Sequence, residues 1–116
     1  MTSREIQDLV EDATFDFTMG DNEVALSKLD EALTHDPRCF EAWHAKTEIH
    51  FSMREFDLAR DAGEKALEIR PEDIHIHTSL SRIFMEKGDK ATAEKHGAQA
   101  RMLGWKDELR EKPPEE

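Results

Sequence analysis

The chain has 116 residues, which suits one domain near the lower end of the usual size range. Apolar residues make up 37% and charged residues another 37%, and no run is long and apolar enough to predict membrane insertion. The net charge is −11, with ten acidic against two basic residues in 1–36 and equal numbers of each in 74–116. Nucleic acid is therefore not an expected partner, because phosphate binding needs clustered Lys and Arg.

The cysteine content and the acidic start of the chain indicate its environment. Cys39 is the only cysteine, which excludes an internal disulfide and fits a reducing compartment. No apolar signal segment follows Met1, so a cytoplasmic location is expected. The acidic residues of 1–36 have two interpretations. They keep the protein soluble, or they steer a basic partner or the neutral end of a second copy.

Apolar residues recur with helical spacing along most of the chain, and no useful stretch alternates with a period of two. Gly20, Gly88 and Gly104 are suitable helix stops, while Pro37 and Pro71 disfavour helix in the residue before them. The sequence therefore predicts an all-α protein. The predicted helices cover about 6–17, 24–33, 40–53, 56–69, 74–87 and 90–103.

The helical pattern repeats along the chain with a fixed period of 34 residues, which is the spacing between Pro37 and Pro71. A unit of this length cannot bury its own apolar face and must stack on copies of itself. Alanine at equivalent positions allows close approach where helices cross. We therefore expect an α-solenoid of three antiparallel helix hairpins. The residues that repeat are Pro37 and Pro71, then Ala25, Ala59 and Ala93, and finally Ala32, Ala66 and Ala100.

Three segments, 20–25, 54–59 and 88–93, resemble the inter-helix turn of tetratricopeptide (TPR) repeats. The segment 66–71 resembles the closing segment of that family, and Trp43 stands where its tryptophan usually falls. The resemblance covers nearly the whole chain. It implies a right-handed superhelix within a single domain of residues 1–112, with repeats at about 6–39, 40–73 and 74–107.

Several residues depart from the TPR pattern. His50 and His77 occupy places where the family has large aromatic residues. Asp12 and Asp16 replace apolar residues in the first helix, which suits the polar outer face of a terminal repeat. Gly63 and Gly97 lie inside helices, where each costs about 1 kcal/mol relative to alanine. They indicate close packing, with local flexibility as the alternative.

The end of the chain departs further, because Trp105 stands where a third closing proline would fall. After Gly104 we expect a short C-terminal capping stub, residues 105–112, followed by a disordered tail at 113–116. Trp105 and Leu109 have two interpretations. They lie back on the last hairpin as a lid, or they form an exposed apolar patch that marks an interaction or self-association site.

The TPR resemblance implies that the first helices of successive repeats line a concave groove that holds a peptide or helix. Three larger side chains, Phe17, Phe51 and Met85, recur beside this lining and either pack between helices or form an apolar floor. The implied lining comprises Gln7, Glu11, Thr14 and Thr18 from the first repeat, Glu41, His44, Glu48 and Ser52 from the second, and His75, Thr78, Ser79, Arg82 and Glu86 from the third.

The chemistry of this lining favours a basic or amphipathic protein segment, because it is mildly acidic and holds two histidines. One TPR subclass grips a terminal carboxylate with lysines, asparagines and an arginine. The matching positions here lack such donors, so a chaperone-tail adaptor is not expected. Those positions are Val10, Thr14, Ala45, His75 and Ser79.

Neither a metal site, a cofactor site nor catalysis is expected. His44 and Glu48 share a helix face and His75 is a conceivable third ligand, but no HExxH motif or cysteine pair supports a metal. Glycine-rich phosphate loops are absent, and Cys39 has no recognisable base. The sequence predicts a non-catalytic protein–protein interaction module, an adaptor or scaffold. The alternatives are a self-associating building block, as a dimer or open chain, and a small TPR-type chaperone for a secreted or assembled partner.

Overall fold

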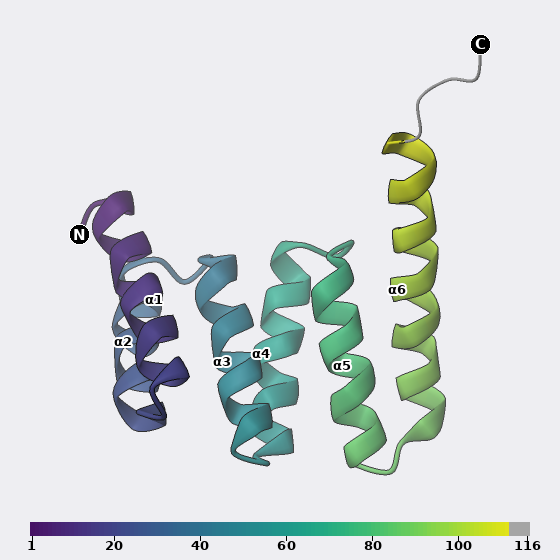
Figure 1. Ribbon diagram of the computed structural model, residues 1–116, viewed down its shortest axis with the longest axis horizontal. Coiled ribbons are helices and arrows are strands. Elements are labelled where there is room, and N and C mark those ends of the chain that lie inside the picture. Colours follow the sequence, from purple (N-terminus) through teal and green to yellow (C-terminus); the bar gives the residue numbers. More distant parts are fainter. Residues whose placement is uncertain (112–116) are drawn as a thin grey trace.

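The structure is a computed structural model that describes residues 1–111. This part of the chain is all-helical and holds no strand, which confirms the predicted fold class (Figure 1). The predicted tail at 113–116 lies outside the described residues, as does residue 112. The helices are α1 (Ser3–Thr18), α2 (Asn22–His35), α3 (Phe40–Ser52), α4 (Phe56–Ile69), α5 (Ile74–Glu86) and α6 (Lys90–Glu111).

The helices form three hairpins, α1–α2, α3–α4 and α5–α6, arranged in chain order (Figure 1). Each hairpin contacts the next through its second helix, so that α2 packs on α3 and α4 packs on α5. The first helices also contact one another, α1 with α3 and α3 with α5. This connectivity makes two layers, α1–α3–α5 and α2–α4–α6, and confirms the predicted α-solenoid.

The turn inside each hairpin has the same geometry at equivalent positions of the three repeats. Gly20, Arg54 and Gly88 take positive φ angles of 89°, 61° and 84°. Glycine adopts this left-handed conformation freely, whereas for Arg54 it costs about 1 kcal/mol. Each turn is closed by a backbone N–H that reaches back to the preceding helix, as in a Schellman motif. These bonds run from Asp21 to Asp16 (2.8 Å), from Glu55 to His50 (2.9 Å) and from Asp89 to Phe84 (2.9 Å).

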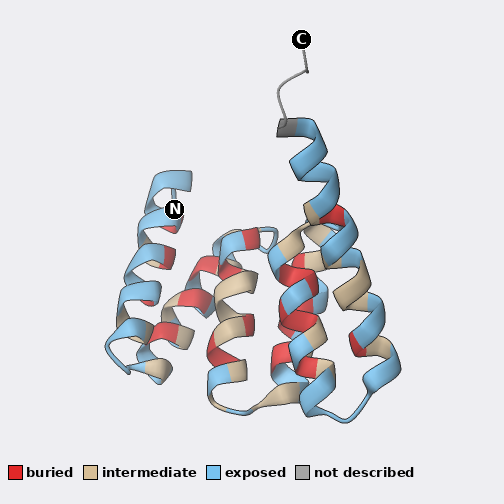
Figure 2. Ribbon diagram, turned by 45° about the vertical axis from the view of Figure 1, so that its right-hand side comes forward, coloured by how far each residue is buried: buried red, intermediate tan, exposed pale blue. Residues whose placement is uncertain are grey.

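The repeating alanines lie where the helices cross. Ala25, Ala59 and Ala66 have no exposed surface, and Ala93 has 1%. Larger apolar residues fill the space around them in two clusters, one between α1, α2 and α3 and the other between α3, α4 and α5 (Figure 2). The first cluster includes Ile6, Val10, Leu29 and Ile49, and the second includes Phe40, Ile76, Leu80 and Ile83.

The mid-helix glycines differ in their surroundings. A Cβ atom on Gly63 would lie 2.9 Å from Cδ2 of Leu80, so α4 and α5 approach closely there. On Gly97 a Cβ atom would meet only Oγ of Ser81 at 3.3 Å and Nη1 of Arg101 at 3.6 Å. The packing interpretation therefore holds firmly for Gly63, whereas the equivalent position on α6 is more open.

The predicted capping stub is wrong, because α6 continues as one helix from Lys90 to Glu111. Gly104 does not take a positive φ, and Trp105 replaces the proline that accompanies the end of α4 at position 71. The distal part of α6 extends beyond the other helices (Figure 1). Trp105 and Leu109 on this part are 67% and 62% exposed. The lid interpretation is therefore wrong, and both side chains are exposed as the alternative expected.

Two buried histidines, His50 and His77, occupy positions where TPR repeats have large aromatic residues. His50 packs with Nδ1 3.0 Å from Oε1 of Glu55. On α5, Nε2 of His77 donates to the carbonyl of Pro71 (2.8 Å), and Nδ1 of His77 lies 3.1 Å from Nδ1 of His96. His96 also stacks on Phe84, with ring centroids 5.7 Å apart.

Candidate functional site

The predicted groove residues lie on α1, α3 and α5, the layer in which the first helices contact one another. Their exposure varies along this layer. Six of them are exposed, namely Glu11, Thr14, Glu41, His75, Arg82 and Met85. Phe17, His44, Glu48 and Phe51 are half-buried, and Ser79 is buried.

Glu48 is the centre of a polar network that joins α3 to α5. Ser79 donates its hydroxyl to Oε1 of Glu48 at 2.5 Å, and Nη1 of Arg82 lies 3.9 Å from Oε2. Nε2 of His44 lies 3.8 Å from Oε1 of Glu48, and the ring of His44 stacks on His75 with centroids 6.4 Å apart. The carboxylate of Glu48 is thus engaged by residues of its own chain.

The three larger side chains beside the lining have separate surroundings. Phe17 packs against the first apolar cluster. Phe51 meets Phe56 edge to face at 5.6 Å, with the guanidinium of Arg82 4.4 Å from its ring centroid. Met85 is 55% exposed and lines a recess between α5 and α6 at the end of the array.

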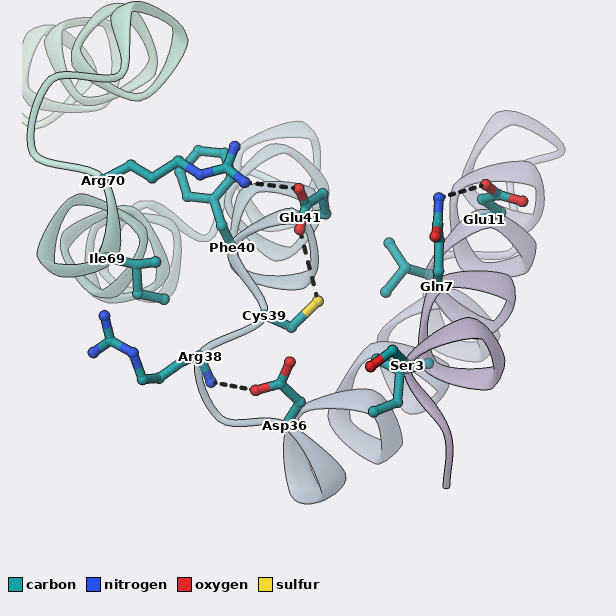
Figure 3. A pocket seen from close by; sticks show the side chains of 12 residues that line it. Ser3, Gln7, Glu11, Asp36, Arg38, Cys39, Phe40, Glu41, Ile69 and Arg70 are labelled. Carbon is teal, nitrogen blue, oxygen red and sulfur yellow. Dashed lines mark hydrogen bonds and ion pairs between the residues drawn. The ribbon is translucent and has the colours of Figure 1, made fainter.

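A cavity of about 410 Å³ opens between α1, the α2–α3 turn and the adjoining ends of α3 and α4 (Figure 3). Its floor is apolar and its rim carries both signs of charge. Gln7, Glu11 and Glu41 of the predicted lining contribute to it, whereas none of its other residues was predicted to line the groove. The full lining is Ser3, Ile6, Gln7, Val10, Glu11, Asp36, Arg38, Cys39, Phe40, Glu41, Ile69 and Arg70.

The rim charges are partly organised by contacts within the chain. Nη2 of Arg70 lies 3.1 Å from Oε1 of Glu41, and its guanidinium covers the ring of Phe40 at 4.1 Å (Figure 3). Across the cavity, Nε2 of Gln7 donates to Oε1 of Glu11 at 3.5 Å. The rim therefore offers carboxylates and guanidinium groups within one opening.

Cys39 lies at this cavity with its Sγ 3.9 Å from Oε2 of Glu41. Burial raises the pKa of the Cys39 thiol, and the Glu41 carboxylate adds to the rise. The thiol therefore stays protonated at neutral pH and is a poor nucleophile, since the thiolate is the reactive form. The cavity is suited to binding rather than to covalent chemistry.

The histidines and the helix lengths bear on metal ions and membranes. No group of three or more His, Cys, Asp or Glu side chains in residues 1–111 is placed to hold a metal ion. The rings of His44 and His75 lie nearly parallel, with an interplanar angle of 14° and centroids 6.4 Å apart, which is an offset stacking geometry. Within the same residues, no helix has the length and apolar character needed to cross a membrane.

Comparison with known proteins gives the fold and no more. No protein-family model matches the chain, and no curated protein matches it either. Among solved structures it is similar to two of MamA, with TM-scores of 0.83 and 0.84 and 22% identity in both. These cover 96% and 88% of this chain, which spans 61% and 60% of those chains.

The chain is also similar to the type III secretion translocator chaperone SycD of Yersinia enterocolitica, in a structure described as an alternative dimer. That match has a TM-score of 0.84 and 19% identity, and it covers 97% of this chain and 81% of SycD. Agreement over this length at such low identity shows a common backbone architecture. The fold is a TPR-like α-solenoid.

Proposed function

We propose that the chain is a TPR-type protein-interaction module, with repeats at 6–39, 40–73 and 74–107, that binds a segment of a partner protein on the α1–α3–α5 layer. The observation that carries this proposal is the cavity between α1 and α3, because it joins predicted groove residues to an apolar floor. Its volume of about 410 Å³ lies near the lower end of ligand pockets. It suits one or two side chains of a peptide or helix.

The lining favours an amphipathic segment. Ile6, Val10 and Phe40 offer an apolar floor, and burial of an apolar anchor there contributes about 25 cal/mol per Å². Glu11 and Arg38 at the rim can pair with polar residues of either sign that flank the anchor. A purely basic segment gains less along the α3–α5 part of the layer, where Arg82 already neutralises Glu48.

Binding would rely on preorganisation. The Glu48 network and the His44–His75 stack tie α3 to α5, while Glu41 and Arg70 tie α3 to the end of α4. A surface that is fixed before the ligand arrives loses less conformational entropy on binding. No reaction is part of this proposal, since the module acts by holding its partner.

The test is a pull-down from the native extract with a matched pair of variants. Gln7→Trp places a bulky side chain at the cavity, whereas Gln99→Trp makes the same substitution on α6, outside the cavity. We expect a partner retained by the wild type and Gln99→Trp to be lost by Gln7→Trp. If all three proteins retain the same partners while folded by circular dichroism, the cavity is not the binding site.

A second candidate is a chaperone of the TPR type, and the likeness to SycD over 81% of that protein favours it. A chaperone keeps its partner soluble before assembly, whereas an adaptor holds a folded partner. Co-expression of the captured partner with and without the module distinguishes the two. A partner that is insoluble alone and soluble with the module supports the chaperone, and equal solubility supports the adaptor.

A further inference from the structure

The interface between α4 and α5 shows how one repeat receives the next. Leu80 of α5 sits over Gly63 of α4, where a Cβ atom would lie 2.9 Å from Leu80 Cδ2. Ile76 and Ile83 lie on the same side of α5, and Leu67 of α4 packs against this cluster. The contact is antiparallel, because Lys87 at the end of α5 bonds to Asp57 at the start of α4. A glycine notch thus receives a side chain from the incoming helix.

The C-terminal end of the array presents the same positions one repeat later. Gly97 of α6 corresponds to Gly63, Arg101 corresponds to Leu67, and Met85 of α5 corresponds to Phe51. Gly97, Arg101 and Met85 line a recess of about 580 Å³, together with Ser81, Ala93, Glu94 and Ala98. Within residues 1–111 no further helix packs here. We call this surface the tail face.

The outer side of α1 carries the complementary positions, two repeats before those of α5. Asp8 corresponds to Ile76, Asp12 to Leu80 and Phe15 to Ile83. All three are exposed, and Phe15 has 64% of its surface exposed although it is large and apolar. We call this surface the head face. It has the layout of an incoming helix with two apolar residues replaced by carboxylates.

We infer that copies of this chain stack end to end, with the head face of one copy on the tail face of the next. In the register of the α4–α5 contact, Asp12 enters the notch at Gly97. There it meets Arg101, whose Nη1 lies 3.6 Å from the position of a Gly97 Cβ atom. Asp8 lies opposite Arg101 in the same register, and exposed Phe15 comes to exposed Met85. The internal apolar contact thus becomes a charge pair beside an apolar one.

A contact of this kind already occurs inside the chain. Lys46 occupies in the second repeat the position that Leu80 has in the third. Its Nζ lies 2.8 Å from Oδ1 of Asp30 on α2, the helix that precedes it in the array. The interface between the first two repeats therefore uses an ion pair at this position. The Asp12–Arg101 pair extends the same arrangement to a neighbouring molecule.

The geometry determines the kind of assembly. The head and tail faces are different surfaces at opposite ends of the array, so the contact is heterologous and produces open chains unless its rotation closes a ring. Sedimentation equilibrium of the full chain should therefore give a mass above 13.4 kDa that keeps rising with concentration. A strict monomer, or a mass that stops at the dimer, would overturn the inference.

Charge reversal tests the assigned residues. We expect Asp12→Lys and Arg101→Glu each to weaken association at least tenfold, because like charges then meet in the notch. A 1:1 mixture of the two variants should restore association, since each reversed face finds its opposite. The control Glu68→Lys makes the same charge change on α4, outside both faces, and should leave association unchanged. Failure of the mixture to recover would contradict the Asp12–Arg101 pairing.

A steric variant and a second surface complete the test. Gly97→Leu fills the notch while favouring helix, so it should weaken association in a chain that remains folded by circular dichroism. Trp105→Ser/Leu109→Ser removes the exposed apolar residues of distal α6. If that variant abolishes association while Asp12→Lys does not, the contact lies on distal α6 and the inference is wrong. None of these residues lines the α1–α3 cavity, so the two proposals fail independently.

Discussion

Replacing Gly63 by alanine sets two opposing effects against each other, and the structure indicates which is larger. Alanine favours helix over glycine by about 1 kcal/mol. Its methyl group, however, would lie 2.9 Å from Cδ2 of Leu80, 3.3 Å from Cγ of Leu80 and 3.5 Å from Cγ2 of Thr47. Leu80 and Thr47 have no exposed surface, so neither can move into solvent. Overpacking of this kind costs about 1–3 kcal/mol.

The net expectation is that Gly63→Ala lowers the free energy of unfolding by up to about 2 kcal/mol. For a chain of this size, each kcal/mol shifts the melting temperature by about 4 °C. Gly104→Ala is the matched control, because nothing lies within 4 Å of its Cβ position and its φ is not positive. It should raise stability by up to about 1 kcal/mol. Thermal unfolding followed by circular dichroism measures both, and equal stabilisation by the two substitutions would refute the packing argument.

Three further predictions concern the turn, the distal helix and the partly buried His96. Arg54→Gly should raise the free energy of unfolding by about 1 kcal/mol in urea titrations, because its φ of 61° suits glycine. Trp105→Ser/Leu109→Ser should change it by less than about 0.5 kcal/mol, since both side chains are exposed. Burial, followed by the neighbouring His77, lowers the pKa of His96 below 6.5, so stability should fall as the pH of the unfolding buffer drops through that value.

The sign of the pH effect follows from proton uptake. Below pH 6.5 the unfolded chain binds a proton at His96 that the folded chain binds only at lower pH, so acid favours unfolding in that window. His96→Phe should flatten this part of the profile and retain stacking on Phe84, whereas the exposed control His35→Gln should not. An undiminished slope in His96→Phe would exclude His96 as its source. A large loss of stability in Trp105→Ser/Leu109→Ser, or in Arg54→Gly, would likewise contradict the geometry assigned to them.

The repeat made most of the fold predictable. Its constant period indicated where the turns fall and which alanines are buried, apart from the partly buried Ala100 of the last repeat, because equivalent positions recur several times along the chain. The prediction for the end of the chain, after Gly104, was not supported by equivalent positions in other repeats. Gly104 indicates a stop by local propensity, but helix continues through it because Trp105, unlike proline, keeps a backbone N–H. The identity of residue 105 thus determines whether α6 ends at Gly104 or continues through it.

The candidate site was less predictable, for a different reason. Spacing assigned Glu48, Ser79 and Arg82 to one lining, but the contacts that Glu48 makes with the other two cross between repeats and become visible only when α3 and α5 are in contact. The cavity likewise joins Ser3, Arg38 and Arg70 from three separate segments. Such neighbours follow from the packing of one hairpin on the next. Sequence periodicity gives the layer on which a residue lies, but not its cross-helix contacts.

The connectivity of the array also determines the order in which its hairpins unfold locally. No helix of the first hairpin contacts a helix of the third within residues 1–111, so these two communicate only through α3–α4. The central hairpin has a neighbour on both sides, whereas each outer hairpin has one. Opening therefore proceeds from the ends inward, as in a one-dimensional chain of coupled units. Amide hydrogens of α3 and α4 should exchange last, and a ligand held between α1 and α3 would slow exchange at the start of the chain as well as at its centre.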